Sequence, residues 1–164
     1  MTSTFNRLTA AAVAIGVGAA GGARARDDKM PATASAATTT AYARHENFER
    51  LGAASKSLND ELRKGSPDKA VVARSAATMN QLVTALPTWF PRGSGVEARP
   101  MSEAKANIWT DAAGFTAAAT ASRTEIGKLN AAAASGDINA VKAAVRPVGG
   151  SCKACHDKYR QQKS

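Results

Sequence analysis

The sequence predicts an all-α fold, an antiparallel four-helix bundle. Apolar residues recur at steps of three and four along four segments, which is the period of one helix face. Alanine dominates the composition and aromatic residues make up only 5% of the chain, which favours closely packed helices over a β-sandwich. Short turns and one longer crossing connect the segments, as in bundles whose helices run up and down.

The first predicted helix follows a Thr/Ala-rich tail at residues 30–40 and ends at Gly65. Ser66 and Pro67 are expected to begin the second helix, with the serine as N-cap and the proline in the first turn, where its missing N–H costs nothing. The apolar stripes are Ala41, Arg44, Phe48, Leu51, Ser55, Leu58 and Leu62 in the first helix and Val72, Ser75, Met79, Leu82 and Leu86 in the second.

A crossing segment at residues 87–100 contains too much proline and glycine for a regular helix, and its Trp89 and Phe90 are expected to pack inward. Ser102 is the expected cap of the third and longest helix, and Gly136 with Asp137 would end it and cap the fourth. The inward stripe of the third helix is Ile108, Ala112, Phe115, Ala119, Ser122, Ile126, Leu129 and Ala133. That of the fourth helix is Ile138, Val141, Val145, Val148, Cys152, Cys155 and Tyr159.

Pro147 and the glycines at 149 and 150 predict a break in the fourth helix, with Ser151 recapping its last stretch. Cys152 and Cys155, the only two cysteines of the chain, both fall on the inward stripe. A group attached to these cysteines would therefore be buried among the helices.

Residues 152–156 read Cys-Lys-Ala-Cys-His, the C-x-x-C-H motif at which haem is attached through two thioether bonds. Two thiols one turn apart can each add to a vinyl group of one porphyrin, while the adjacent imidazole of His156 reaches the iron. A disulfide, a thioredoxin-like pair and half of a zinc site are the alternatives. No strand pattern surrounds the motif, and only His45 and His156 could complete a zinc site. One covalent haem c is therefore predicted, bound through Cys152 and Cys155, with His156 as the metal ligand.

Three separated segments, residues 86–93, 108–115 and 148–160, resemble cytochrome c′, a class II c-type cytochrome with its haem motif near the C-terminus and itself a four-helix bundle. The resemblance covers residues 41–163, and Pro147 departs from the usual pattern. It implies that His156 is the proximal ligand, that Arg160 lies beside it at the haem edge, and that Arg44 meets a haem propionate. Independently, Arg44 falls on an apolar stripe, where an unpaired charge is costly. The alternative is an arginine that reaches solvent.

Phe48 lies one turn beyond Arg44 on the same face. Six-coordinate relatives of this class carry methionine there, whereas phenylalanine cannot bind iron. The resemblance therefore implies five-coordinate, high-spin iron with an apolar distal side that binds nitric oxide and carbon monoxide. Met79 and His45 could fill the open position only if they faced the haem, and we expect Met79 in the core and His45 in solvent.

The alternative function is a six-coordinate, low-spin electron-transfer cytochrome. The net charge of +9 indicates either a solvated basic surface or steering toward acidic redox partners or anionic membranes. No basic run is interleaved with stacking aromatics, so nucleic acid is not an expected partner. No constellation typical of an enzyme is present. The resemblance implies a homodimer, and a basic tail, Lys153, Lys158, Arg160 and Lys163, could dock a redox partner that the sequence does not identify.

Arg7 precedes an apolar stretch that runs to about residue 20, which is the length of a signal-peptide core and too short to span a bilayer. Cleavage could follow Ala25 or Ala36, and an uncleaved anchor is the alternative. We expect residues 1–36 to be a signal peptide and disordered tail and residues 37–164 to be the haem domain. Covalent haem attachment of this type is done outside the bacterial cytoplasm, which predicts a periplasmic protein.

Overall fold

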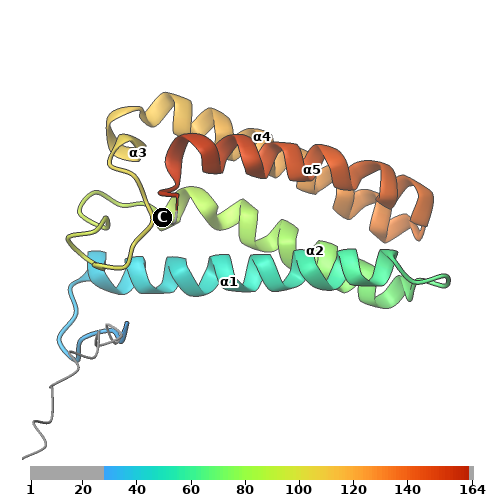
Figure 1. Cartoon of the computed structure of the whole chain (residues 1–164), viewed down its shortest axis with the longest axis horizontal. Coiled ribbons are helices and arrows are strands. Elements are labelled where there is room, and N and C mark those ends of the chain that lie inside the picture. Colours follow the sequence, from blue (N-terminus) through green and yellow to red (C-terminus); the bar gives the residue numbers. More distant parts are fainter. Residues whose placement is uncertain (1–27, 163–164) are drawn as a thin grey trace, which may run out of the picture.

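The computed structural model describes residues 28–162, and within them the chain forms helices joined by turns and one long crossing. Four long helices run side by side, with the two short turns at one end and the crossing segment and the C-terminus at the other (Figure 1). The described part holds no β-strand, so the predicted all-α bundle is confirmed. The elements are α1 (Ala36–Leu62), α2 (Lys69–Ala85), the 3-10 helix η1 (Leu86–Trp89), α3 (Asn107–Thr110), α4 (Ala112–Ser135) and α5 (Ile138–Tyr159).

The core lies where α1, α2, α4 and α5 meet, and it is built from the predicted stripes. Helix α2 packs on α1 and on α4, and α4 packs along α5. Met79 lies inside this core and is 2% exposed, as expected. Trp89 is buried and Phe90 packs against the core, which confirms that both point inward. The largest of the fully buried apolar side chains are Leu58, Val72, Val83, Ile126, Leu129 and Val141.

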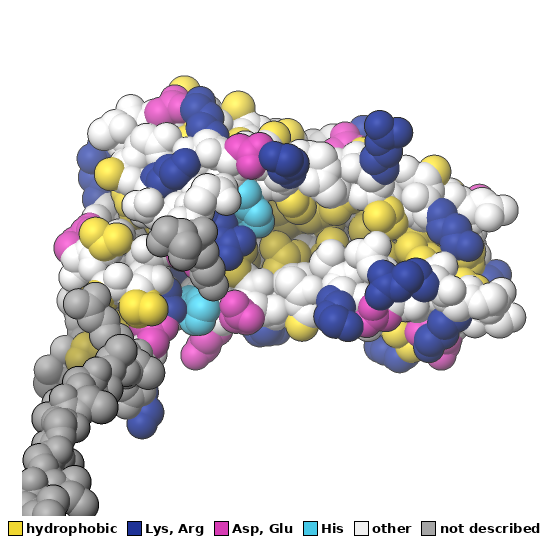
Figure 2. Space-filling view, in the orientation of Figure 1, with side chains coloured by type: hydrophobic (Ala, Val, Ile, Leu, Met, Phe, Trp, Pro, Cys, Tyr) yellow, Lys and Arg dark blue, Asp and Glu magenta, His cyan; other side chains and the backbone are white. Residues whose placement is uncertain are grey.

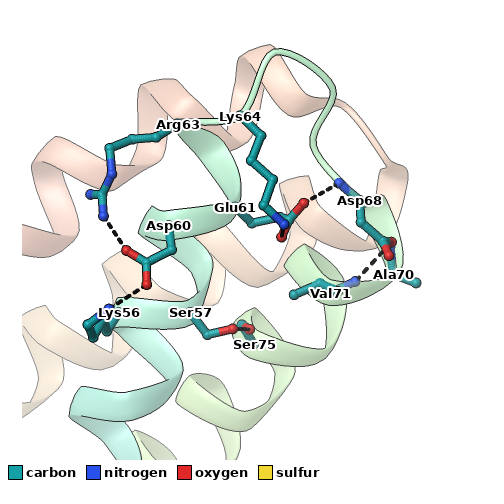
Figure 3. A network of polar contacts seen from close by, with 10 residues as sticks. All are labelled: Lys56, Ser57, Asp60, Glu61, Arg63, Lys64, Asp68, Ala70, Val71 and Ser75. Atoms are coloured by element: carbon teal, nitrogen blue, oxygen red, sulfur yellow. Dashed lines mark hydrogen bonds and ion pairs between the residues drawn. The ribbon is translucent and has the colours of Figure 1, made fainter.

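The turn between α1 and α2 differs from the prediction at its cap. Asp68, not Ser66, is the N-cap of α2, and its Oδ1 accepts hydrogen bonds from the backbone N–H groups of Ala70 and Val71 at 2.8 and 3.3 Å. The buried Glu61 fixes this cap, because its Oε1 accepts the Asp68 N–H at 2.7 Å (Figure 3). A carboxylate that satisfies two helical N–H groups therefore outcompetes the serine two residues earlier.

The predicted third helix is divided in the structure. Asp111 interrupts it after the single turn of α3, and its carboxylate caps α4 by accepting the Gly114 N–H at 3.1 Å. The expected cap Ser102 lies instead in the crossing segment, which in the structure extends from η1 to residue 106, and its hydroxyl accepts a hydrogen bond from the Arg44 guanidinium at 3.2 Å. The prediction for Gly136 and Asp137 is confirmed, since Gly136 ends α4 with φ of 73° and Asp137 caps α5.

Helix α5 runs unbroken through Pro147, so the predicted break before the haem motif is wrong. Pro147 is exposed on the helix surface, where its ring meets solvent rather than a neighbouring helix. Ser151 does not recap the chain, because its hydroxyl donates to the Val148 carbonyl one turn back at 2.8 Å. The two cysteines and His156 consequently lie on one continuous helix.

Helix α1 begins at Ala36, so the end of the Thr/Ala-rich tail is helical. Ser35 is its N-cap and accepts the Thr38 N–H at 3.1 Å. The residues before it contact the body of the protein, because Tyr42 donates its hydroxyl proton to the Lys29 carbonyl at 3.1 Å. The predicted signal-peptide core lies outside the described residues. From residue 28 to residue 162, no helix is long and apolar enough to cross a bilayer.

Candidate haem site

A groove separates α1 from α5. Each of these helices packs closely on another partner, α1 on α2 and α5 on α4, but the two do not pack closely on each other. Figure 2 shows the hollow between the upper and lower helix pairs, with apolar side chains along its floor. Partly buried apolar side chains that pack against the core include Phe48 and Leu51 on α1 and Val145, Cys152 and Cys155 on α5.

The haem motif lies at an open cavity of about 600 Å³ at the C-terminal end of α5. This volume is within the range of small-molecule and cofactor sites. Cys152 and His156 are one helical turn apart and both line it, which places a thiol and an imidazole on the same wall. The lining residues are Gly149, Cys152, Lys153, His156, Asp157, Arg160, Gln161 and Gln162.

The two thiols are free and partly buried. Burial raises the pKa of both Cys152 and Cys155, and a hydrogen bond from Ser151 offsets only part of the rise at Cys152. A thioredoxin-like pair requires the opposite, a thiol whose pKa is lowered so that the thiolate forms. The environment of these cysteines therefore disfavours a redox-active dithiol and suits attachment of an apolar group.

His156 is half-buried on the groove wall. Burial lowers the pKa of its imidazole, the Arg160 guanidinium lowers it further, and Asp157 and Glu103 act in the opposite direction. Neutral imidazole is the form that binds a metal ion. The surroundings of His156 thus favour its ligating form at neutral pH.

Arg160 lines the same wall and is paired with a carboxylate. Its Nε donates to Glu103 Oε2 at 2.6 Å. The neighbouring cations of the predicted basic tail are paired as well, Lys153 with Asp157 at 2.6 Å and Lys158 with Asp111 at 2.7 Å. Lys163 lies outside the described residues. The tail is therefore locally balanced in charge, which weakens the expectation that it docks an acidic partner through unpaired lysines.

Arg44 is 4% exposed, so the alternative of an arginine that reaches solvent is wrong. Its Nη1 donates to the Trp89 carbonyl at 3.0 Å and to the Ser94 hydroxyl at 2.9 Å. Its Nη2 donates to the Ser94 carbonyl at 2.5 Å and to the Ser102 hydroxyl at 3.2 Å, and the guanidinium lies 4.7 Å from the Phe90 ring centre. Burial, followed by the charge of Arg99, lowers the pKa of Arg44 to about 10.

Arg44 therefore holds the crossing segment against α1, a role that the sequence does not reveal. Ser94, which is fully buried, and Ser102 are its partners, 50 and 58 residues further along the chain. Nothing in the local sequence pairs these positions with Arg44. The position of Arg44 on an apolar stripe indicates that its charge has a partner in the folded protein. It does not indicate which residues that partner comes from.

Phe48 belongs to a chain of aromatic side chains that closes the crossing end of the bundle. Its ring meets the Trp89 ring edge-on at 5.3 Å and the Phe90 ring at 6.3 Å. Phe90 packs on Phe115 at 4.8 Å, and Phe115 packs on Tyr159 at 5.3 Å. At position 48, α1 therefore carries an aromatic hydrocarbon ring that packs against the core and has no atom that could bind iron.

The residues that could replace a ligand at position 48 lie elsewhere. Met79 is enclosed in the core and His45 is exposed, as predicted. Met101 is 47% exposed in the crossing segment. Of the described residues that line the cavity, Cys152 and His156 have side chains typical of haem axial ligands, and the haem motif assigns Cys152 to a thioether bond, which leaves His156.

Comparison with known proteins gives a consistent result. The family model described as Cytochrome C′ matches residues 39–160. The cytochrome c′ of Rubrivivax gelatinosus is 41% identical over 99 residues, which are 58% of this chain and 72% of that protein. Its crystal structure has a TM-score of 0.70 at 31% identity and covers 79% of this chain and all of that one. A nitric oxide complex of a cytochrome c prime variant from Alcaligenes xylosoxidans has a TM-score of 0.69 at 29% identity, covering 77% and 97%.

Proposed function

Because the chain belongs to the cytochrome c′ family, we propose that it is a periplasmic haem protein with five-coordinate, high-spin iron that binds nitric oxide and carbon monoxide. Proteins of this family carry covalently attached haem c, which is accordingly the cofactor of this chain. One observation carries the proposal. Helix α5 carries two thiols and an imidazole on one side of the groove, whereas α1, on the other side, carries the hydrocarbon ring of Phe48.

The residues of the groove fit a haem. Cys152 and Cys155 would form the two thioethers, and His156 would bind the iron from the α5 side. Haem iron, when bound, supplies a site for a diatomic gas and a one-electron redox couple. Arg44 is the cation proposed for a propionate, although its four terminal N–H donors are engaged by the crossing segment. A propionate would therefore share or displace one of these partners.

Phe48 would govern which ligands enter. The rings of Phe48 and its neighbour Phe90 carry no polar atom that could hydrogen-bond to a bound water, so they disfavour water on this side. A small neutral gas loses little solvation on entering such a surface. The relative solved as a nitric oxide complex supports this gas as the ligand.

The second candidate, a six-coordinate electron-transfer cytochrome, needs a second protein ligand. The positions of Met79, in the core, and His45, in solvent, favour the open site over it. One-electron transfer remains part of the proposal, because an open iron can still change its oxidation state. We further propose that the protein is a homodimer without catalytic activity, and sedimentation analysis of the holoprotein is the test of the dimer.

The test of the main proposal is the optical and resonance Raman spectrum of the exported protein, ferric and ferrous, with and without nitric oxide. Five-coordinate high-spin bands that change on adding the gas are expected. A low-spin, six-coordinate ferrous spectrum that is indifferent to nitric oxide would contradict the proposal and favour the electron carrier.

A further inference from the structure

The residues that follow His156 are held by the crossing segment rather than left free. The Lys105 N–H donates to the Tyr159 carbonyl at 3.0 Å, and the Gln161 N–H donates to the Glu103 carbonyl at 2.7 Å. Ala104 and Arg160 form an isolated antiparallel bridge between these two bonds. Because α5 ends at Tyr159, this pairing fixes the direction in which the chain leaves the helix at Arg160.

Side chains strengthen the same junction. The Asn107 amide donates to the Lys158 carbonyl at 3.1 Å, and the Lys105 ammonium donates to the Asp157 carbonyl at 3.0 Å. These carbonyls belong to the last turn of α5, where no helical N–H remains to pair with them. The end of the haem-bearing helix is therefore docked at several points, and Glu103 is placed opposite Arg160 by the backbone itself.

The Glu103–Arg160 ion pair lies at the wall that carries the iron ligand. Arg160 lines the cavity together with His156, and its Nε is 2.6 Å from Glu103 Oε2. Arg160 is four residues beyond His156, which is about one helical turn, so the pair lies near the metal position. Its two charges have opposite signs and oppose each other there.

On the basis of the proposed function, we propose that Glu103 is a positioning residue for Arg160 that sets the reduction potential of the haem iron. Its carboxylate holds the guanidinium at the groove wall and offsets the positive charge. A cation near the iron stabilises the ferrous state relative to the ferric state, because the ferrous haem carries one positive charge fewer. Glu103 therefore keeps the potential lower than Arg160 alone would set it.

The expected effect is modest, because the side chains of Arg160 and Glu103 are 46% and 31% exposed and solvent screens their charges. We expect the equilibrium constant for reduction to rise about threefold in E103Q, which corresponds to about 28 mV for a one-electron couple. The glutamine retains an oxygen that can accept the Arg160 N–H, so this variant changes charge more than shape.

The experiment is a spectroelectrochemical titration of the haem-loaded protein and its variants. E103Q should raise the potential, R160Q should lower it because a positive charge is removed from the cavity wall, and the double variant E103Q/R160Q should return close to the wild-type value. E125Q is the matched control. It removes the same charge from an ion pair with Lys128 on α4, and should leave the potential unchanged.

An unchanged potential in haem-loaded E103Q, or an equal rise in E125Q, would overturn this inference and leave the proposed function standing. A wild-type protein that carries no covalent haem would overturn both. If E103Q folds poorly, R160Q alone tests the same ion pair. A reduction potential of R160Q at or above the wild-type value would then overturn the inference.

Discussion

Whether iron in this groove keeps an open coordination position depends on the side chain at position 48. Phe48 lies on the face of α1 that also carries Arg44, and its ring is held edge-on by Trp89 and packs on Phe90. These ring contacts restrain Phe48, and in the proposed haem protein position 48 would combine exclusion of water with the absence of a protein ligand.

Replacing Phe48 with methionine should close the site. The thioether is a good iron ligand and methionine is flexible enough to fill the space of the ring. F48M is expected to give a low-spin, six-coordinate ferrous spectrum and to bind nitric oxide at least about tenfold more weakly, which is about 1.4 kcal/mol. F48L is the control, and its spectrum should stay high-spin. A high-spin F48M would show that position 48 does not face the iron.

Arg44 has a structural role in addition to its proposed contact with haem. R44A would remove the donor to two backbone carbonyls and two serine hydroxyls in a buried setting. Leaving such acceptors unpaired costs about 1–3 kcal/mol each, and partial rehydration reduces the sum. We expect R44A to lower the free energy of unfolding by about 2–4 kcal/mol in urea titration. The exposed R50A on the same helix should change it by less than about 0.5 kcal/mol.

At the scale of elements, carboxylate side chains hold the junctions at the ends of the helices by hydrogen bonds. Glu61 joins the end of α1 to the cap of α2, Asp111 caps α4, and Glu103 holds the residue after α5. At the α1–α2 turn, the Lys64 ammonium and the Asp68 N–H lower the pKa of Glu61 below its usual 4.5 (Figure 3). A carboxyl whose pKa is lower in the folded state stabilises the fold above its unfolded pKa.

This stabilisation should be lost as the pH falls below 4.5 and through the folded pKa of Glu61. E61Q removes the titrating group, so its melting temperature should fall less steeply over that interval than the wild-type value. Thermal melts between pH 6 and about pH 3 measure the difference. Parallel curves for the two proteins would show that Glu61 contributes nothing to the acid sensitivity of the fold.

The start of α1 bears on where a signal peptide would be removed. Cleavage after Ala36 would delete the N-cap Ser35, whose loss costs about 1 kcal/mol, together with Asp28, which pairs with the buried Arg99. Cleavage after Ala25 would retain both contacts. We predict that the exported protein begins at Arg26, and intact mass spectrometry measures this. A mature protein that begins at Ala37 would contradict the prediction.

At the scale of the whole molecule, the bundle has a groove along one side. Helices α2 and α4 close the rear of the core, whereas α1 and α5 face each other across the groove at the front (Figure 1, Figure 2). Their partly buried apolar side chains would gain a partner from a flat apolar cofactor. Haem attachment is thus expected to stabilise the fold as well as to supply its chemistry.

C152S/C155S should therefore fold less stably than the holoprotein. A loss of about 3 kcal/mol would lower the melting temperature by roughly 10 °C for a chain of this size. Hydrogen exchange should accelerate in α1 and α5 more than in α2 and α4, because the first pair flanks the groove and does not pack closely together without the cofactor. Equal acceleration in all four helices would contradict a local role for the groove.

The sequence by itself determined the helices, their inward faces and the haem motif. Spacings of three and four are local properties, so the linear pattern predicts Leu58, Val72, Ile126 and Val141 in the core, and they are buried. Cys152, Cys155 and His156 lie within five residues of one another, so their spacing alone indicated the cofactor. The sequence predicts helix ends less well, because neighbouring residues such as Ser66 and Asp68 are both suitable N-caps and lie only two positions apart.

Only the tertiary structure decided what joins the elements. The partners of Arg44 lie in the crossing segment, Glu103 meets Arg160 across 57 residues, and Tyr159 donates to Asp111 across 48. No periodicity encodes such pairs, because they depend on how the crossing segment returns over the end of the bundle. The continuity of α5 through Pro147 was decided in the same way, since an exposed ring and tertiary packing outweigh one missing helical hydrogen bond.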